Sequence, residues 1–280
     1  MLRTSGVRVL GPDDLDDVRA LLAREPVADV FVAGRIEAGG LDGWRSGAEV
    51  WGWGERGRLE SLCWSGANLV PVQAGPDAVR AFADRARRTG RRCSSIVGAS
   101  SCVDPLWDLL RPHWGPARDL RAGQPLLAID TEPLVPADPA VRQVRPDELD
   151  VLLPACIAMF TEEIGVSPVA GDGGALYRAR VAELIGQGRA FARIEDGTVV
   201  FKAEVGAVTR EACQVQGVWV HPSLRGRGLS VAGTAAVVRL ARERLAPVVS
   251  LYVNDYNTAA RRAYDRVGFR QVGTFTSVLF

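Results

Sequence analysis

The residues of this sequence whose types and spacing could do chemistry begin in a glycine-rich stretch. An apolar run, Gly217 to Val220, leads through His-Pro into Arg225-Gly226-Arg227-Gly228-Leu229-Ser230. Apolar residues at helical spacing from Leu229 to Ala246, ended by Pro247, predict a helix directly after the glycines. Glycines let a bulky anion approach the backbone, and the free amides and positive dipole end of a helix attract it. The stretch therefore predicts a strand, a turn and a helix that bind a phosphate group.

A second segment of interest follows an apolar strand predicted from Val248 to Val253. Residues 257–269 predict a helix with Asn257 as its N-cap and Gly268 beyond its C-terminus. The apolar face of this helix carries Tyr264, whose phenolic hydroxyl can donate a proton. The segment therefore offers a candidate acid close in the chain to the predicted phosphate site.

Together the two segments resemble the Gcn5-related N-acetyltransferase (GNAT) superfamily. Arg225 and Gly228 match its motif A, Gln/Arg-x-x-Gly-x-Gly/Ala, with Ser230 at the last position. Residues 257–269 fit its closing segment, Asn-x-x-Ala-x-x-x-Tyr-x-x-x-Gly-Phe, without a gap. The dinucleotide fingerprint is excluded because the third glycine is missing, and the P-loop because Gly-Lys-Ser/Thr is missing. The resemblance covers the chain from about residue 140 to its end.

The resemblance implies acetyl-CoA as co-substrate and no metal. It implies that the pantetheine arm lies along the strand before the glycines, where a backbone N–H near Val218 polarises the thioester carbonyl. It also implies that Tyr264 protonates the departing CoA thiolate. The cofactor-binding residues implied in this way are Val218, Trp219, Val220, Arg225, Gly226, Arg227, Gly228, Leu229, Ser230, Asn254 and Asn257.

The general base for the acceptor amine has to come from outside the usual strand, because that strand carries Gln214 and Gln216, which cannot accept a proton. Glu204 on the preceding predicted strand is one candidate. Glu162 and Glu163 at the end of a predicted helix are two others, and we expect either to serve better than Glu204. The alternative for each carboxylate is a solvated position on the surface.

Composition narrows the class of protein. The 280 residues are 47% hydrophobic, enough for two cores, and 34 basic residues balance 33 acidic ones. This balance argues against nucleic acid or an anionic membrane as partner. No apolar run approaches the roughly 20 residues of a membrane span, and the N-terminus lacks a signal-peptide core. We therefore expect a cytoplasmic protein.

Two residue types add detail. The five cysteines are scattered without Cys-x-x-Cys spacing, so we expect buried, reduced thiols and no zinc site. Nearly all basic residues are arginine, which indicates a GC-rich bacterial source. The single lysine, Lys202, is expected to bury its stem and keep its amine in water.

An internal repeat divides the chain. Val7 to Asp16 aligns with Val141 to Asp150 at a constant offset of 134, and six of the ten positions are identical. Each copy predicts a short strand, a Pro-Asp cap and a helix, Asp13 to Ala23 and Asp147 to Phe160. The predicted organisation is a degenerate GNAT-like domain without a CoA motif at 1–130, a proline-rich linker at 131–140, and an acetyl-CoA-binding catalytic domain at 141–280.

In the first copy, Glu49 to Gly54 and Arg58 to Trp64 predict a hairpin, and Pro76 to Arg88 predict a helix. Ser65 to Pro71 occupies the nearest place comparable to the glycine turn and lacks its paired glycines. In the second copy, Ala190 to Glu195, Val199 to Val205 and Glu211 to Val220 predict strands. The expected fold class is α+β, with two tandem GNAT-like domains, each a mixed, mainly antiparallel sheet flanked by helices.

The predicted function is an N-acetyltransferase that moves an acetyl group from acetyl-CoA to an amine by direct attack in a ternary complex. The acceptor is a small-molecule or protein amine, and the protein is a monomer or homodimer. The alternative from another class is a CoA-binding regulatory or scaffold module without transfer activity. Among enzymes, a mycothiol-synthase-like acetyltransferase is the nearest specific alternative.

Overall fold

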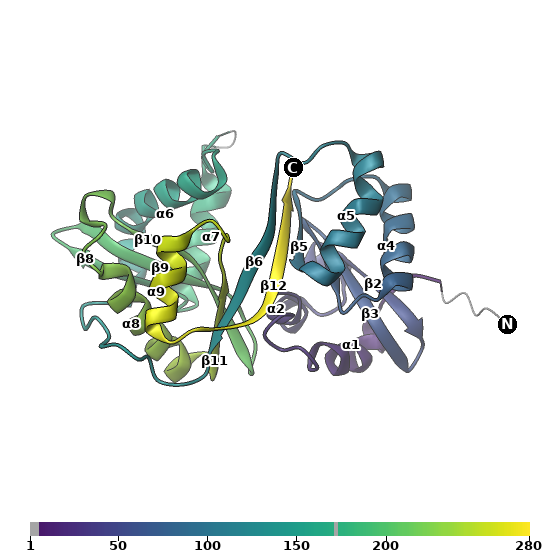
Figure 1. Cartoon of the computed structure of the whole chain (residues 1–280), viewed down its shortest axis with the longest axis horizontal. Helices are drawn as coiled ribbons and strands as arrows, with labels where there is room; N and C mark the ends of the chain where they lie inside the picture. The colour runs from purple at the N-terminus through teal and green to yellow at the C-terminus, as the bar shows by residue number, and fades with distance from the viewer. Residues whose placement is uncertain (1–5, 171–172) are drawn as a thin grey trace. The chain divides into compact units, whose positions relative to one another are not determined.

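The computed structural model describes residues 6–170 and 173–280, apart from the side chain of Arg45. The chain forms two compact units. The first contains the described residues up to Leu126 together with Tyr252–Tyr256 and Gln271–Phe280. The second contains Leu127–Leu251 and Asn257–Arg270. Each unit is built on a mixed, mainly antiparallel sheet with helices on its faces, the predicted α+β fold class (Figure 1).

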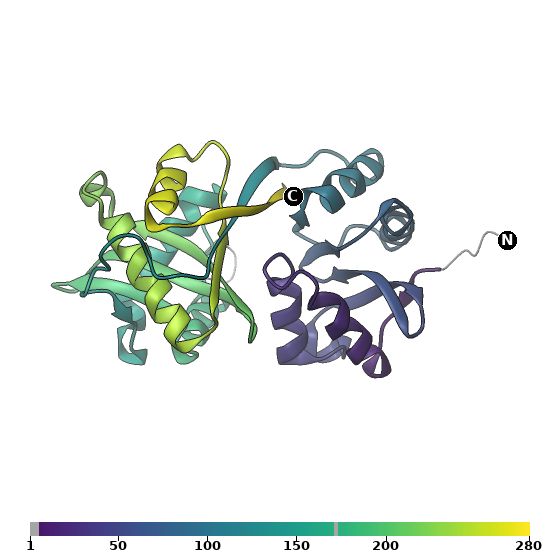
Figure 2. The same ribbon diagram turned by 60° about the horizontal axis from the view of Figure 1, so that its bottom comes forward.

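In the first unit the strand order is β1-β2-β3-β4-β5-β12-β6. Successive residues of its strands face opposite sides, so Val50 packs with α1 and α2 and Trp51 with α4 and α5. Figure 2 shows these two helix pairs on opposite faces of the strands. The elements are β1 (Arg8–Val9), η1 (Pro12–Asp14), α1 (Leu15–Leu22), α2 (Val30–Gly39), α3 (Gly43–Ser46), β2 (Glu49–Glu55), β3 (Arg58–Ser65), β4 (Asn68–Val72), α4 (Pro76–Thr89), β5 (Ser95–Ala99), α5 (Ser100–Trp114) and β6 (Asp119–Ile129), which continues into the second unit.

The second unit repeats this order of elements, with the strands arranged β6-β11-β10-β9-β8-β7. Helices α6 and α7 pack on one face of the sheet, against Ala190, Ala192 and Trp219. Helix α8 packs on the ring of Phe201 and lies beside α9 (Figure 1). The elements are β7 (Arg142–Gln143), η2 (Pro146–Glu148), α6 (Leu149–Ile164), α7 (Ala175–Gly186), β8 (Ala190–Glu195), β9 (Thr198–Val208), β10 (Ala212–Val220), η3 (Pro222–Leu224), α8 (Leu229–Arg244), β11 (Val248–Tyr252) and α9 (Thr258–Val267), followed by β12 (Arg270–Leu279), which lies mostly in the first unit.

The last strand of the chain belongs mostly to the first unit. Residues Phe275 to Leu279 of β12 pair antiparallel with Ala99 to Ser95 of β5. By its place in the repeated order, β12 is the counterpart of β6, so the strand that closes the second set of elements pairs with a strand of the first set. The division into independent domains at 1–130 and 141–280 stays a prediction.

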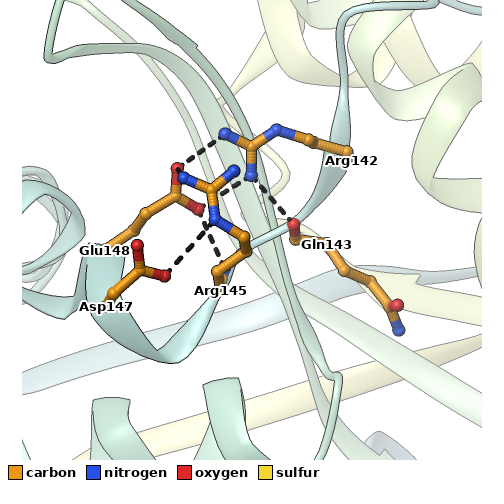
Figure 3. Close-up of polar contacts among 5 residues, drawn as sticks. All are labelled: Arg142, Gln143, Arg145, Asp147 and Glu148. Carbon is orange, nitrogen blue, oxygen red and sulfur yellow. Dashed lines mark hydrogen bonds and ion pairs between the residues drawn. The ribbon is translucent and has the colours of Figure 1, made fainter.

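Both copies of the repeat open with the same local structure. In the second copy, Arg142 donates to both carboxylate oxygens of Glu148, at 2.7 and 2.6 Å, and the amide of Arg145 donates to Glu148 at 2.9 Å (Figure 3). In the first copy, Arg8 donates to Asp14 at 2.7 Å, and the amide of Gly11 donates to the same carboxylate at 3.0 Å. Each pair ties a short strand to the 3₁₀ turn before the first helix. The Arg142 contact, together with the Arg145 amide, lowers the pKa of Glu148 to about 2.

One part of the predicted first copy is wrong. Ser65 to Pro71 is not a strand-to-helix connection, because it contains the turn between β3 and β4 and most of β4 itself. The connection equivalent to the glycine turn is residues 73–75, which joins β4 directly to α4 with Gly75 as the N-cap. This connection is shorter and lacks paired glycines, so the first copy still lacks motif A.

Other predictions from local pattern are confirmed. The β2–β3 and β8–β9 hairpins, α4 and α8 lie at the predicted places, and Asn257 caps α9 by accepting from the amide of Ala260 at 3.2 Å. All five cysteines are free and buried. Among the described residues, helices are all too short or too polar to cross a membrane.

Candidate active site

The glycine turn between η3 and α8 exposes a run of backbone amides. Gly226 and Gly228 have φ of +78° and +79°, a conformation that favours glycine, and a Cβ at either would meet nothing within 4 Å. Within the described part of the chain, the amides of residues 226–230 have no hydrogen-bond acceptor. The first amides of a helix lack intrahelical partners, so this turn presents donors at the positive end of α8. The geometry of the turn suits an anion.

Beside this turn, β10 separates from β11. The ladder pairs Ala212 with Val248, Cys213 with Val249 and Gln214 with Ser250, and no later β10–β11 pair is formed among the described residues. In the same part of β10 a bulge interrupts pairing with β9 between Gln216 and Trp219. Because the later half of β10 has no partner on the β11 side, its edge is available to an extended ligand. This edge contains the predicted residues Val218, Trp219 and Val220.

The bulge of β10 packs against a buried ion pair, Lys202 with Glu204. Lys202 is 1% exposed, which contradicts the expectation that its amine reaches water. Its Nζ donates to Glu204 Oε2 at 3.0 Å and to Cys156 Sγ at 3.5 Å. Burial lowers the pKa of the Lys202 amine, but the Glu204 charge and then Cys156 outweigh it, so the pKa is raised. Sequence alone missed this pair, although the apolar run on either side of Lys202 was a signal for a buried amine.

Glu204 is also held from β10. Gln216 Nε2 donates to Glu204 Oε1 at 3.0 Å, so each carboxylate oxygen has a different partner. The Glu204 side chain is still 12% exposed. A Cβ added to Gly217, whose φ is +59°, would lie 3.3 Å from Glu204 Cδ and 3.1 Å from Lys202 Nζ. The carboxylate therefore lies against the backbone of the bulge.

Glu162 at the end of α6 is engaged by two residues of the β10 side. It accepts from Arg225 Nη2 at 2.7 Å and from Trp219 Nε1 at 3.3 Å. Arg225 Nε also donates to the Val220 carbonyl at 3.1 Å. The guanidinium of motif A is thus already paired with a carboxylate, and Arg227 is the other basic side chain of the turn. Glu162 therefore fixes the position of the Arg225 guanidinium.

Tyr264 on α9 lies in the interior of the second unit. It is 8% exposed, and its ring meets Phe269 edge-on with centroids 5.8 Å apart. Burial raises the pKa of its hydroxyl, and the charge of Glu163 raises it further. The phenol therefore stays protonated at neutral pH, as a proton donor must. Glu163 itself is exposed near the end of α6.

Tyr177 lies near Cys156, and the sequence did not single it out. Its hydroxyl, on α7, donates to the Cys156 carbonyl at 3.0 Å. Burial contributes most to raising the pKa of the Tyr177 hydroxyl, and electrostatic interactions with Cys156, Glu204 and Glu163 raise it further. The Tyr177 bond ties α7 to α6 beside the Lys202–Cys156 contact.

The two predicted asparagines have different places. Asn257 caps α9 and belongs to the second unit. Asn254 groups with the first unit, where its Oδ1 accepts from Gln124 Nε2 at 2.9 Å. Both cofactor-binding roles stay predictions. Within residues 6–170 and 173–280, no cluster of His, Cys, Asp or Glu side chains could hold a metal ion.

Two family models match parts of the chain. Residues 170–269 match the family model described as "Acetyltransferase (GNAT) family", and residues 48–152 match a domain of unknown function, DUF4081. Residues 170–269 therefore form a domain of the GNAT acetyltransferase family. No curated protein matches the sequence.

Solved structures share the fold over nearly the whole chain. A GNAT-family acetyltransferase from Colwellia psychrerythraea is 14% identical with a TM-score of 0.55, over 98% of this chain and 99% of the other. A GCN5-related N-acetyltransferase from Kribbella flavida is 17% identical with a TM-score of 0.57, over 91% and 94%. A tandem GNAT protein from the clavulanic acid biosynthesis pathway is 16% identical with a TM-score of 0.58, over 98% of each chain. These likenesses establish a tandem GNAT fold.

Proposed function

We propose that this protein is an N-acetyltransferase that transfers the acetyl group of acetyl-CoA directly to an amine. The observation that carries the proposal is the run of five acceptor-free amides, residues 226–230, next to the unpaired edge of β10. The amides suit a diphosphate, and the edge suits the amide-bearing pantetheine arm. Arg227 adds positive charge beside the turn.

In the proposed reaction the amine nitrogen attacks the thioester carbonyl carbon. A C–N bond forms, the C–S bond breaks, and the amine gives a proton to a carboxylate. The thiolate takes the proton of the Tyr264 hydroxyl, which solvent later replaces. A backbone N–H of the bulge near Val218 would polarise the carbonyl.

For the carboxylate we favour Glu204 over the choice that the sequence suggested. Glu162 bonds Arg225 and Trp219 beside the glycine turn, and Glu163 is exposed near the end of α6. Glu204, although bonded by Lys202 and Gln216, lies against the bulge at Gly217, beside the strand edge proposed for the thioester. An amine with a pKa near 10 is almost wholly protonated at pH 7, so a fixed carboxylate attracts the cation. The cation loses one proton to solvent before the attack, and the carboxylate accepts the second proton as the C–N bond forms.

The test is thiol release from acetyl-CoA in the presence of single amines, namely putrescine, glucosamine and a peptide with a free N-terminus, with product mass measured. Acetylated amine in equal amount to free CoA is the expected result. Tight acetyl-CoA binding without acetylation of any of these probes would favour a CoA-binding regulatory module instead.

A further inference from the structure

The Lys202–Glu204 pair is an unusual use of buried charge. Lys202 is the single lysine of the chain and is 1% exposed, between apolar neighbours on β9. Taking two charges out of water costs several kcal/mol per ion, and the attraction between them often only balances that cost. An apolar pair would fill the same space, so stability alone does not account for this one.

The geometry shows what the pair does to Glu204. The ammonium lies 3.0 Å from Oε2, and Gln216 Nε2 lies 3.0 Å from Oε1. The carboxylate is thus held from β9 on one oxygen and from β10 on the other. Cys156 on α6, 3.5 Å from Nζ, fixes the ammonium in turn.

The held carboxylate lies where the proposed reaction takes place. The bulge at Gly217 marks the point where β10 has left β11, and it packs on Glu204 and Lys202. No side chain could be placed on Gly217 without displacing these groups, because Lys202 Nζ and Met159 Cε would lie 3.1 and 2.9 Å from its Cβ. The packing therefore sets the distance between the carboxylate and the bulge.

We infer that Lys202 is a positioning residue, which acts through Glu204 to hold the carboxylate toward the acceptor amine, with Gln216 as a second anchor. The inference rests on the proposed acetyl transfer. It assigns Lys202 no contact with substrate. Its consequence is that removing Lys202 matters for turnover of the amine only while Glu204 is present.

The experiment is a double-mutant cycle of Lys202→Met and Glu204→Gln, with putrescine, glucosamine or the peptide as acceptor, whichever the wild type acetylates. Lys202→Met should lower kcat/KM for the amine by about 10- to 100-fold, as expected for a misplaced group. Acetyl-CoA affinity should stay within about twofold. In the Glu204→Gln background, Lys202→Met should have almost no further effect on kcat/KM, because residues that act through one another are not additive.

A matched control comes from a second ion pair of the same unit. Arg193 contacts Asp138 at 2.9 Å, and the Asp138 side chain is 8% exposed. Arg193→Met should lower stability without changing kcat/KM for the amine in either background. If Lys202→Met gives no folded protein, Gln216→Leu carries the same test, since Gln216 is exposed and bonds the other Glu204 oxygen.

The outcomes separate the two proposals. Equal falls in kcat/KM in both backgrounds, with the loss tracking stability, would show that Lys202 is structural only and overturn the inference. A wild-type protein that acetylates none of the probes would overturn the proposed function, and the positioning role with it.

Discussion

Replacing Gly228 by alanine tests the anion site most directly. Gly228 has φ +79° and ψ 0°, and a Cβ at this position would meet nothing within 4 Å. The added methyl group therefore has room in the free protein and enters only the space in which a ligand would approach the amides. Gly197, in the β8–β9 turn of the same unit, is the matched control, with φ +73° and nothing within 4 Å of its Cβ.

Both substitutions impose the same conformational cost on the folded protein, but only Gly228→Ala should also weaken ligand binding. A left-handed conformation costs an L-residue about 1–2 kcal/mol, so both variants should unfold at a temperature a few degrees lower. Only the Gly228 methyl separates a diphosphate from the acceptor-free amides of residues 226–230. Loss of two hydrogen bonds to a charged group, at about 1.5–3 kcal/mol each, would weaken acetyl-CoA binding by about 10²- to 10⁴-fold.

Calorimetric titration with acetyl-CoA measures this difference, and thermal unfolding confirms that both variants are folded. Gly197→Ala should bind acetyl-CoA like the wild type. If Gly228→Ala binds as tightly as Gly197→Ala, the phosphates lie elsewhere and the anion-site reasoning is refuted.

Three further predictions follow from the same structure. Tyr264→Phe should leave acetyl-CoA affinity and stability nearly unchanged and lower kcat by about 10- to 10⁴-fold if proton donation is lost; an unchanged, chemistry-limited kcat would make Tyr264 a packing residue. The full chain should bind one acetyl-CoA, because the first unit joins β4 to α4 by residues 73–75 without a glycine turn; calorimetry that finds two sites would contradict this. Burial raises the pKa of Asp29 to about 7, against a bond from Gln73 that lowers it. The folded state then binds the extra proton, so Asp29 contributes most stability below about pH 4 and loses it as pH rises toward 7; denaturant unfolding of Asp29→Asn should show a flatter pH dependence, and an unchanged slope would refute it.

The sequence by itself determined the elements whose signals are local. The glycine turn, the Asn257 cap, the two hairpins and the repeated strand, cap and helix at Val7 and Val141 were all predictable. Each depends on residues close in the chain, through backbone conformation, capping or strand alternation. The ion pairs at the start of the two copies, Arg8 with Asp14 and Arg142 with Glu148, also join residues within a span of seven.

Only the tertiary structure decided contacts between distant segments. Nothing local to β12 indicates that it pairs with β5, because strand pairing depends on edges that other elements leave available. Glu162 meets Arg225 only because α6 packs beside β10. The apolar run around Lys202 could signal a buried amine, but only the tertiary structure places Glu204 and Cys156 around it, and the energy of a buried charge depends on such partners.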